Sequence, residues 1–146
     1  MKKEDLMIGD WVNFNGTIDK VQEILYVEEK GYCASFAASA TLFPIPLDKI
    51  TPIPITPEIL TEKLGFVVQN EKHLIYDFHI EDKGLVFPDN IRLKGHVKIR
   101  FNENPKGKYE FTWFMNCARL ESLKIQYIHE LQHALKLCKI EKDIVL

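Results

Sequence analysis

Residues 91–101 form the most regular part of the sequence, and this stretch limits the folds that the chain can adopt. Apolar side chains occupy most odd positions, and basic or His side chains occupy the even positions between them. Such alternation is typical of a β-strand with one buried face. A second alternating run, residues 109–113, follows the turn-rich segment 102–107. The two runs predict an antiparallel hairpin, so we expect an antiparallel sheet in this part of the chain.

The first fifty residues also indicate short strands that are separated by turns. Gly9 and Asp10 precede an apolar strand, and residues 21–27 form a run with high β-propensity. A charged turn over residues 28–31 leads into the next strand, whereas residues 37–41 have weak β-propensity and favour a loop. This spacing predicts an SH3-like small β-barrel or meander over residues 1–50.

Three prolines lie close together, at positions 52, 54 and 57. Proline lacks a backbone donor and favours an extended conformation in the residue before it. We therefore expect residues 51–56 to form a hinge between two subdomains. Thr56 is a suitable N-cap, Pro57 suits the first helical position, and Gly65 suits the end, so the sequence predicts a short helix after the hinge.

The second subdomain, residues 57–146, is expected to hold this short helix, an antiparallel β-meander and a C-terminal helix over about residues 119–139. Strand candidates at residues 66–68 and 74–80 precede the hairpin. The C-terminal helix is predicted from apolar residues that recur at helical spacing: Leu120, Tyr127, Ile128, Leu131, Ala134, Leu135 and Cys138. The predicted fold class is therefore α+β, with the C-terminal helix packed on the meander.

The composition excludes several classes of protein. The chain has 146 residues, of which 46% are hydrophobic, so it has enough apolar surface to fold. Its 19 basic and 21 acidic residues exclude a globally basic nucleic-acid binder. No signal peptide or apolar span of about 20 residues is evident, so we expect a cytoplasmic protein with no membrane segment. The widely spaced Cys33, Cys117 and Cys138 indicate buried, reduced thiols.

Residues 129–133 match the H-E-x-x-H pattern of zinc metalloproteases. On a helix this spacing places His129 and His133 on one face, where both can bind the same Zn²⁺. Glu130 between them can act as general base towards a metal-bound water. A zinc-dependent hydrolase is therefore one functional alternative, with zinc as its cofactor.

Three observations weigh against the zinc site. Catalytic zinc takes three protein ligands, but Lys136 and Lys139 stand where the longer pattern requires Gly and His. Only 13 residues follow His133, which leaves little chain to supply another ligand. Helical geometry also places His129 and His133 opposite the apolar stripe, on a face that we expect to be solvated. The main expectation is therefore no catalytic residue, no metal and no cofactor.

The even positions of the regular strand suggest a second alternative. Arg92, Lys94, Lys98 and Arg100 would line one face of a strand, as in a nucleic-acid-binding module. A charged outer face with Glu110 as cross-strand partner is the more ordinary interpretation. The net charge of −2 also gives a polyanion little long-range attraction. We therefore expect a protein partner rather than nucleic acid.

Three blocks of sequence, in order, resemble a known family. They are IGDWV at residues 8–12, IPITPEIL at residues 53–60 with Gly65 and Phe66, and YIHELQ at residues 127–132 with Leu135. The chain resembles a family of small uncharacterised proteins of Bacteroides-type gut bacteria and their phages or prophages. That family has no established activity, so the resemblance implies no catalytic residues. It also implies that His133, the second His of the H-E-x-x-H string, varies, as a zinc ligand would not. We therefore expect a non-enzymatic protein-interaction or structural module, encoded by a chromosome or a prophage.

Overall fold

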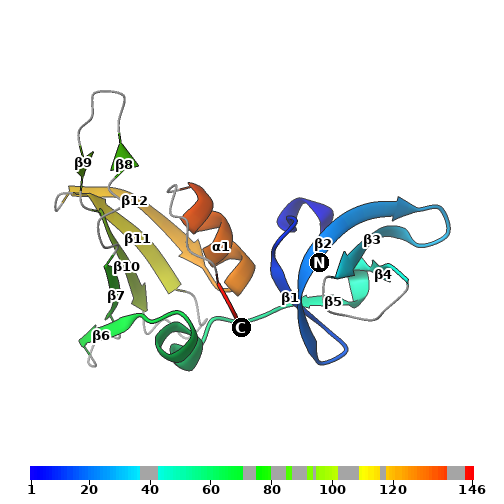
Figure 1. The fold of residues 1–146 in the computed structure, drawn as a ribbon, viewed down its shortest axis with the longest axis horizontal. Coiled ribbons are helices and arrows are strands. Elements are labelled where there is room, and N and C mark those ends of the chain that lie inside the picture. Colours follow the sequence, from blue (N-terminus) through cyan, green and yellow to red (C-terminus); the bar gives the residue numbers. More distant parts are fainter. Residues whose placement is uncertain are drawn as a thin grey trace. The chain divides into compact units, whose positions relative to one another are not determined.

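The computed structural model contains antiparallel strands and a C-terminal α-helix, so the α+β class is confirmed (Figure 1). The structure describes residues 1–36, 43–70, 75–79, 85–86, 92–93, 95–101, 109–115, 118–137 and 144–146. The chain divides into two units. The first contains Met1–Pro54, Tyr127–Gln132 and Leu146, and the second contains Ile55–Gln126 and His133–Val145.

The first unit is built on a five-stranded antiparallel sheet with the strand order β4-β3-β2-β1-β5. The strands are β1 (Trp11–Phe14), β2 (Thr17–Val27), β3 (Gly31–Phe36), β4 (Ile45–Pro46) and β5 (Ile50–Pro52). Two 3-10 turns accompany them: η1 (Lys3–Asp5) and η2 (Leu47–Lys49). The predicted strands in this region and the charged turn before β3 are confirmed, whereas residues 37–41 lie outside the described part of the chain.

The tight turn between β1 and β2 shows why these residues form a hairpin. Asn15 and Gly16 both have positive φ, at 50° and 84°, which is the backbone of a two-residue hairpin loop. The Gly16 N–H donates to the side-chain oxygen of Asn13 at 2.9 Å, and Phe14 pairs with Thr17 across the turn. Asn and Gly tolerate this conformation better than other residues, so the turn sets the register of the two strands.

A closed SH3-like barrel is not confirmed. Strands β4 and β5 are the two ends of the sheet order, and no pairing between them is present among the described residues. What the structure shows is an antiparallel meander in which β5 returns to pair with β1.

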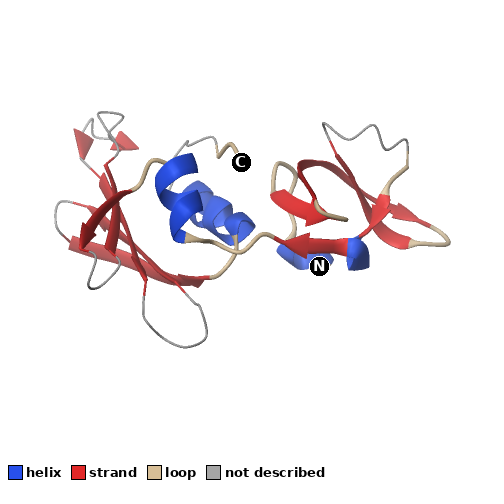
Figure 2. Cartoon of the chain, turned by 90° about the horizontal axis from the view of Figure 1, so that it is seen from below, coloured by secondary structure: helices blue, strands red, loops and turns tan. Residues whose placement is uncertain are grey.

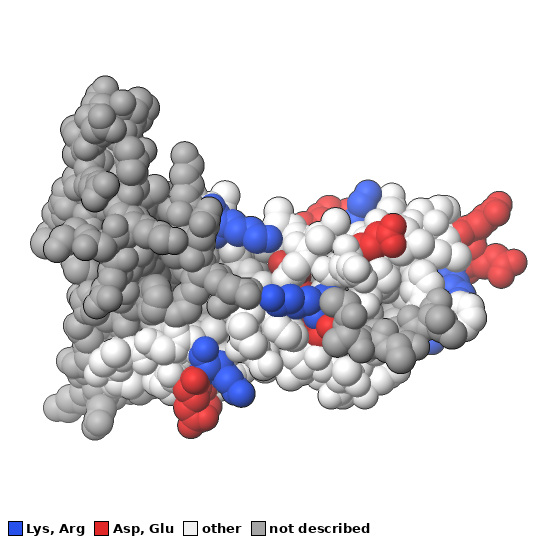
Figure 3. Space-filling view, in the orientation of Figure 1, with Lys and Arg blue, Asp and Glu red and all other residues white. Residues whose placement is uncertain are grey.

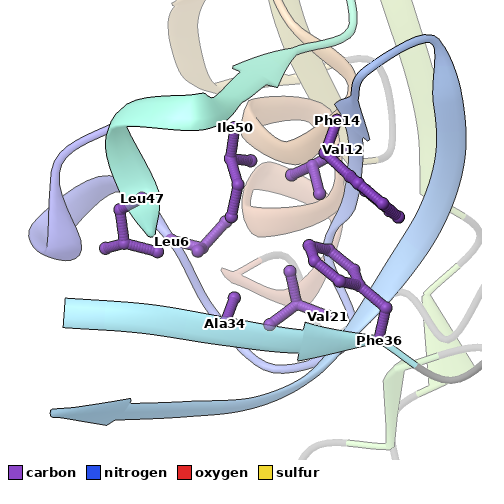
Figure 4. Packing of buried hydrophobic residues seen from close by; sticks show 8 residues of the cluster. All are labelled: Leu6, Val12, Phe14, Val21, Ala34, Phe36, Leu47 and Ile50. Atoms are coloured by element: carbon purple, nitrogen blue, oxygen red, sulfur yellow. The ribbon is translucent and has the colours of Figure 1, made fainter. Parts of the chain in front are cut away.

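The core of the first unit lies on one face of this sheet (Figure 4). Val12 and Phe14 are buried at alternate positions of β1, as expected for a half-buried strand. The rings of Phe14 and Phe36 stack, with centroids 4.4 Å apart and an interplanar angle of 19°. The buried cluster contains Leu6, Val12, Phe14, Val21, Ala34, Phe36, Leu47 and Ile50. Cys33 is also buried and forms no disulfide, in agreement with the prediction for this thiol; Cys117 and Cys138 lie outside the described residues.

The proline segment predicted as a hinge, residues 51–56, is paired with other backbone over part of its length. Its first residues belong to β5, where Pro52 pairs with Val12 at the edge of the sheet, a position that tolerates the missing donor of proline. The Ile53 carbonyl accepts the N–H of Ile128 at 2.9 Å. The Ile55 N–H donates to Gln126 at 3.0 Å. Pro52 and Pro54 alternate with Ile53 and Ile55, so the two isoleucines form these hydrogen bonds. Both isoleucine side chains are buried.

The short helix after the prolines is confirmed together with both of its predicted ends. The hydroxyl of Thr56 accepts the N–H of Ile59 at 3.3 Å, which is the N-cap interaction. The segment η3 (Ile59–Lys63) forms a wide turn that ends at Gly65, whose φ is +67°. The N–H of Phe66 then returns to the carbonyl of Leu60 at 2.9 Å, as in a glycine-terminated helix.

The second unit contains another five-stranded antiparallel sheet, with the order β12-β11-β10-β7-β6. Figure 2 shows the strands of both units in red. Its strands are β6 (Val67–Asn70), β7 (Ile75–His79), β10 (Gly95–Phe101), β11 (Tyr109–Met115) and β12 (Ala118–Ile125). The predicted hairpin is confirmed, since Ile99 pairs with Phe111 in β10 and β11. A separate two-stranded sheet is formed by β8 (Leu85–Val86) and β9 (Arg92–Leu93).

The C-terminal helix α1 (Ile128–Leu137) is shorter than predicted, because residues 118–125 form β12. Leu123 pairs with Phe111, and Ile125 pairs with Tyr109. Exposed Lys124 separates half-buried Leu123 from buried Ile125, so the period is that of a strand. The apolar spacing in this segment fits a helix as well as a strand, and pairing with the edge of β11 decides between them. Residues 138 and 139 lie outside the described part of the chain.

Candidate functional site

The H-E-x-x-H string lies in the first turns of α1, but its first His is not solvated as predicted. His129 is buried, with only 4% of its surface exposed, and His133 is half-buried. The ring of His129 stacks on that of Tyr127, with centroids 5.8 Å apart and an interplanar angle of 12°. Helical periodicity placed His129 opposite the apolar stripe, but the predicted solvation of this side chain was wrong, because periodicity describes one helix and not what surrounds it.

Glu130 forms a hydrogen bond that stabilises the start of the helix. Its Oε2 accepts the backbone N–H of Tyr127 at 3.1 Å, three residues earlier. This is the backward contact of a capping box, in which an acidic side chain satisfies a donor that has no partner within the helix. A carboxylate is also favoured at this end by the helix dipole. Capping of the helix therefore explains the position of Glu130, the candidate general base, without a catalytic role.

Gln132 joins the helix to the N-terminal part of the chain, and sequence reasoning missed this residue. Its Oε1 accepts the backbone N–H of Trp11 at 2.9 Å. Its Nε2 donates to the backbone carbonyl of Gly9 at 3.0 Å. The planar amide therefore satisfies one donor and one acceptor of the same backbone segment, as a neighbouring strand would.

The backbone that Gln132 contacts is itself held in a tight turn. Asp10 is fully buried, and its Oδ2 accepts the N–H of Met7 at 2.7 Å. The N–H of Gly9 donates to the backbone carbonyl of Val21 at 2.7 Å, and the N–H of Val21 donates to the backbone carbonyl of Asp10 at 2.9 Å. Gly9 has a φ of +90°, a conformation that favours glycine. Residues of the first and last blocks of the family resemblance, 8–12 and 127–132, therefore form hydrogen bonds with one another. The occurrence of both blocks in one sequence was the only sign of this contact in the sequence analysis.

The predicted row of basic residues is not a single row in the structure. Lys98 and Arg100 share β10, but Arg92 lies on β9, in the separate two-stranded sheet. Lys94 lies outside the described residues. The prediction was wrong for Arg92 because the alternating run is divided between two strands with different partners, β8 and β7.

Acidic residues occupy register positions beside the two basic residues of β10. Lys98 pairs with Asp77 of β7, and Arg100 pairs with Glu110 of β11. Directly opposite positions of an antiparallel pair lie on the same face of the sheet. The predicted cross-strand position of Glu110 is therefore confirmed, and the register places an acid next to each base.

No match is found in comparisons with protein-family models, curated proteins or solved structures. Within the described ranges, no group of three or more His, Cys, Asp or Glu side chains is arranged to hold a metal ion. None of the helices in that part of the chain has the length and apolar character required to cross a bilayer.

Proposed function

We propose that this protein is a small non-enzymatic module that acts through contacts with another protein. The observation that carries this proposal is that two side chains of the H-E-x-x-H string bind backbone groups of their own chain. Glu130 caps the helix at Tyr127, and Gln132 holds Gly9 and Trp11. A general base must reach the proton that it removes, whereas these contacts give the string a structural purpose.

The topology of the first unit supports an SH3-like interaction module as the finer description. The meander returns through the 3-10 turn η2 to β5, which pairs with β1. Small β-modules with SH3-like topology commonly bind extended peptides through exposed aromatic side chains. Fold alone does not define a function, so the proposal depends on the side chains that this unit exposes. The resemblance to a family without established activity agrees with a non-enzymatic role.

Metal analysis of the full chain tests the proposal against the zinc-hydrolase alternative. The protein is purified without added metal and without chelator, and zinc is measured per chain. We expect no stoichiometric zinc and no hydrolysis of an unfolded protein substrate. One zinc per chain that is lost in His133→Ala and retained in the control Lys136→Ala would overturn the proposal.

A binding assay with a generic oligonucleotide tests the nucleic-acid alternative. We expect no saturable binding, because acidic residues pair with Lys98 and Arg100 in the sheet register. Salt-sensitive binding that is lost when both residues are replaced by Ala would contradict the proposal, since phosphate contacts weaken steeply with salt. Chemical cross-linking in a lysate of the native host provides the positive test, and failure to recover a specific protein partner would also count against the proposal.

A further inference from the structure

The β2–β3 hairpin has an apolar face that continues beyond the core of the first unit. Val21 and Ala34 lie on this face and are buried in the core cluster, and Ile24 packs against that cluster. Ile24 pairs with Ala34, and the next pair on the same face, towards the turn, is Tyr26 with Tyr32. Tyr26 is 65% exposed and Tyr32 is 43% exposed. The core-facing side of the hairpin therefore ends in a solvent-exposed pair of aromatic rings.

One of these rings already binds a cation within the chain. The two rings meet edge to face, with centroids 5.4 Å apart and an interplanar angle of 73°. The ammonium of Lys3 lies 4.3 Å from the centroid of Tyr32 and donates to its hydroxyl at 3.2 Å. The negative face of an aromatic ring attracts a cation at this distance. Tyr26 presents the more exposed ring of the pair.

The surroundings of the tyrosine pair favour a positively charged ligand. Exposed Glu28 and Glu29 lie with exposed Lys30 in the turn directly after β2, and Figure 3 shows acidic side chains at this end of the molecule with a basic one beside them. Residues 1–54 contain five Lys and eight Asp or Glu residues, and two of these acids, Asp10 and Asp19, are buried. The attraction for a cation is therefore local and comes from the two neighbouring carboxylates of Glu28 and Glu29.

We propose that the pair formed by Tyr26 and Tyr32, with Glu28 and Glu29 beside it, binds an arginine side chain of a basic peptide segment in a partner protein. This inference rests on the proposed function and names the surface and the chemistry of the partner. Arginine fits better than lysine, because its planar guanidinium stacks on an aromatic ring and also forms paired hydrogen bonds with a carboxylate.

Fluorescence anisotropy with the full chain tests the surface. The probe is a labelled peptide of alternating arginine and glycine, and its matched control replaces each arginine with citrulline, which keeps the shape but lacks the charge. We expect saturable binding of the arginine peptide alone. Tyr26→Ala should weaken binding about fivefold, since an exposed cation–π contact contributes about 1 kcal/mol. Tyr26→Phe retains the ring and should bind nearly as well as the wild type.

Ile18→Ala is the matched control, because Ile18 lies on the same strand and is 47% exposed. It should leave binding unchanged. Replacing both Glu28 and Glu29 with Gln should weaken binding at low salt and reduce its salt dependence, because screening removes the attraction between exposed charges. Circular dichroism checks that every variant is folded.

Equal binding of the arginine and citrulline peptides, equal binding by wild type and Tyr26→Ala, or no saturable binding would each overturn this inference. These results are distinct from failure of the proposed function, which depends on bound zinc, on hydrolysis, on oligonucleotide binding or on the absence of any specific partner. A zinc-free chain with a specific partner but no arginine recognition would retain the proposed function and refute only this surface.

Discussion

Gln132 holds the backbone of Trp11 across 121 positions of sequence: its side-chain oxygen accepts the Trp11 N–H at 2.9 Å. Its side-chain nitrogen donates to the Gly9 carbonyl at 3.0 Å. A single side-chain amide therefore binds the backbone groups immediately before and after the buried Asp10. The contact attaches the first turns of α1 to the segment that leads into β1. Its loss should therefore affect the folding of the first unit.

Replacing Gln132 with Ala should lower the free energy of unfolding by about 1–3 kcal/mol, because the partly buried donor and acceptor lose their partner. Urea denaturation followed by circular dichroism measures the change. Lys136→Ala, at an exposed position of the same helix, should change stability by less than about 0.5 kcal/mol. Equal stability of the Gln132→Ala variant and the wild type would show that water replaces the amide at no cost.

Glu130 should behave as a helix cap in mutagenesis. Glu130→Ala should destabilise the protein by about 0.5–1 kcal/mol, because the N–H of Tyr127 loses its acceptor. Glu130→Gln retains an acceptor oxygen and should lose less. Thermal melting of the two variants checks this order, and a Gln variant as unstable as the Ala variant would mean that the charge, rather than the hydrogen bond, stabilises the helix.

The stacked pair of Phe14 and Phe36 should contribute strongly to the stability of the first unit. Phe36→Ala should cost about 3–5 kcal/mol, since it removes a buried ring and leaves a cavity. The same substitution at Phe43, which is 72% exposed, provides the control and should cost less than about 0.5 kcal/mol. Chemical denaturation of both variants measures the difference, and a similar loss in each would contradict the position of the core.

The stability of the protein should depend on pH through Glu58. The backbone N–H of Glu58 and the hydroxyl of Thr56 donate hydrogen bonds that lower the pKa of the Glu58 carboxyl, against a smaller opposing effect of burial. Because the pKa of Glu58 is lower in the folded than in the unfolded state, ionised Glu58 stabilises the fold. This stabilisation is complete above about pH 4.3, near the unfolded pKa, and is lost as the pH falls further.

Denaturation midpoints at neutral and acidic pH measure this contribution. Glu58→Gln should show a smaller loss of stability on acidification than the wild type, since the variant has no carboxylate to protonate. Lys63→Ala, an exposed substitution in the same helix, should retain the wild-type dependence. An unchanged dependence in Glu58→Gln would show that the hydrogen bonds to this carboxylate do not persist in solution.

The candidate site was predictable only in part. The H-E-x-x-H spacing placed His129, Glu130 and His133 on a helix, as observed. The burial of His129 was not predictable from helical periodicity, which describes one helix and contains no information about what surrounds it. The role of Gln132 was missed for a similar reason, because its partners lie more than a hundred positions away.

Local chemistry alone was sufficient for the features that depend on a few neighbouring residues. The N-cap at Thr56, the helix end at Gly65, the charged turn before β3 and the β10–β11 hairpin all follow from backbone preferences and from alternation. Tertiary structure decided the features for which one pattern allowed two outcomes. Residues 118–125 became a strand because β11 offered an edge for pairing, and the proline segment was paired because β1 and residues 126–128 supplied partners for the backbone groups that remained. Backbone hydrogen bonds must be satisfied somewhere, and only the assembled chain determines which groups come within reach.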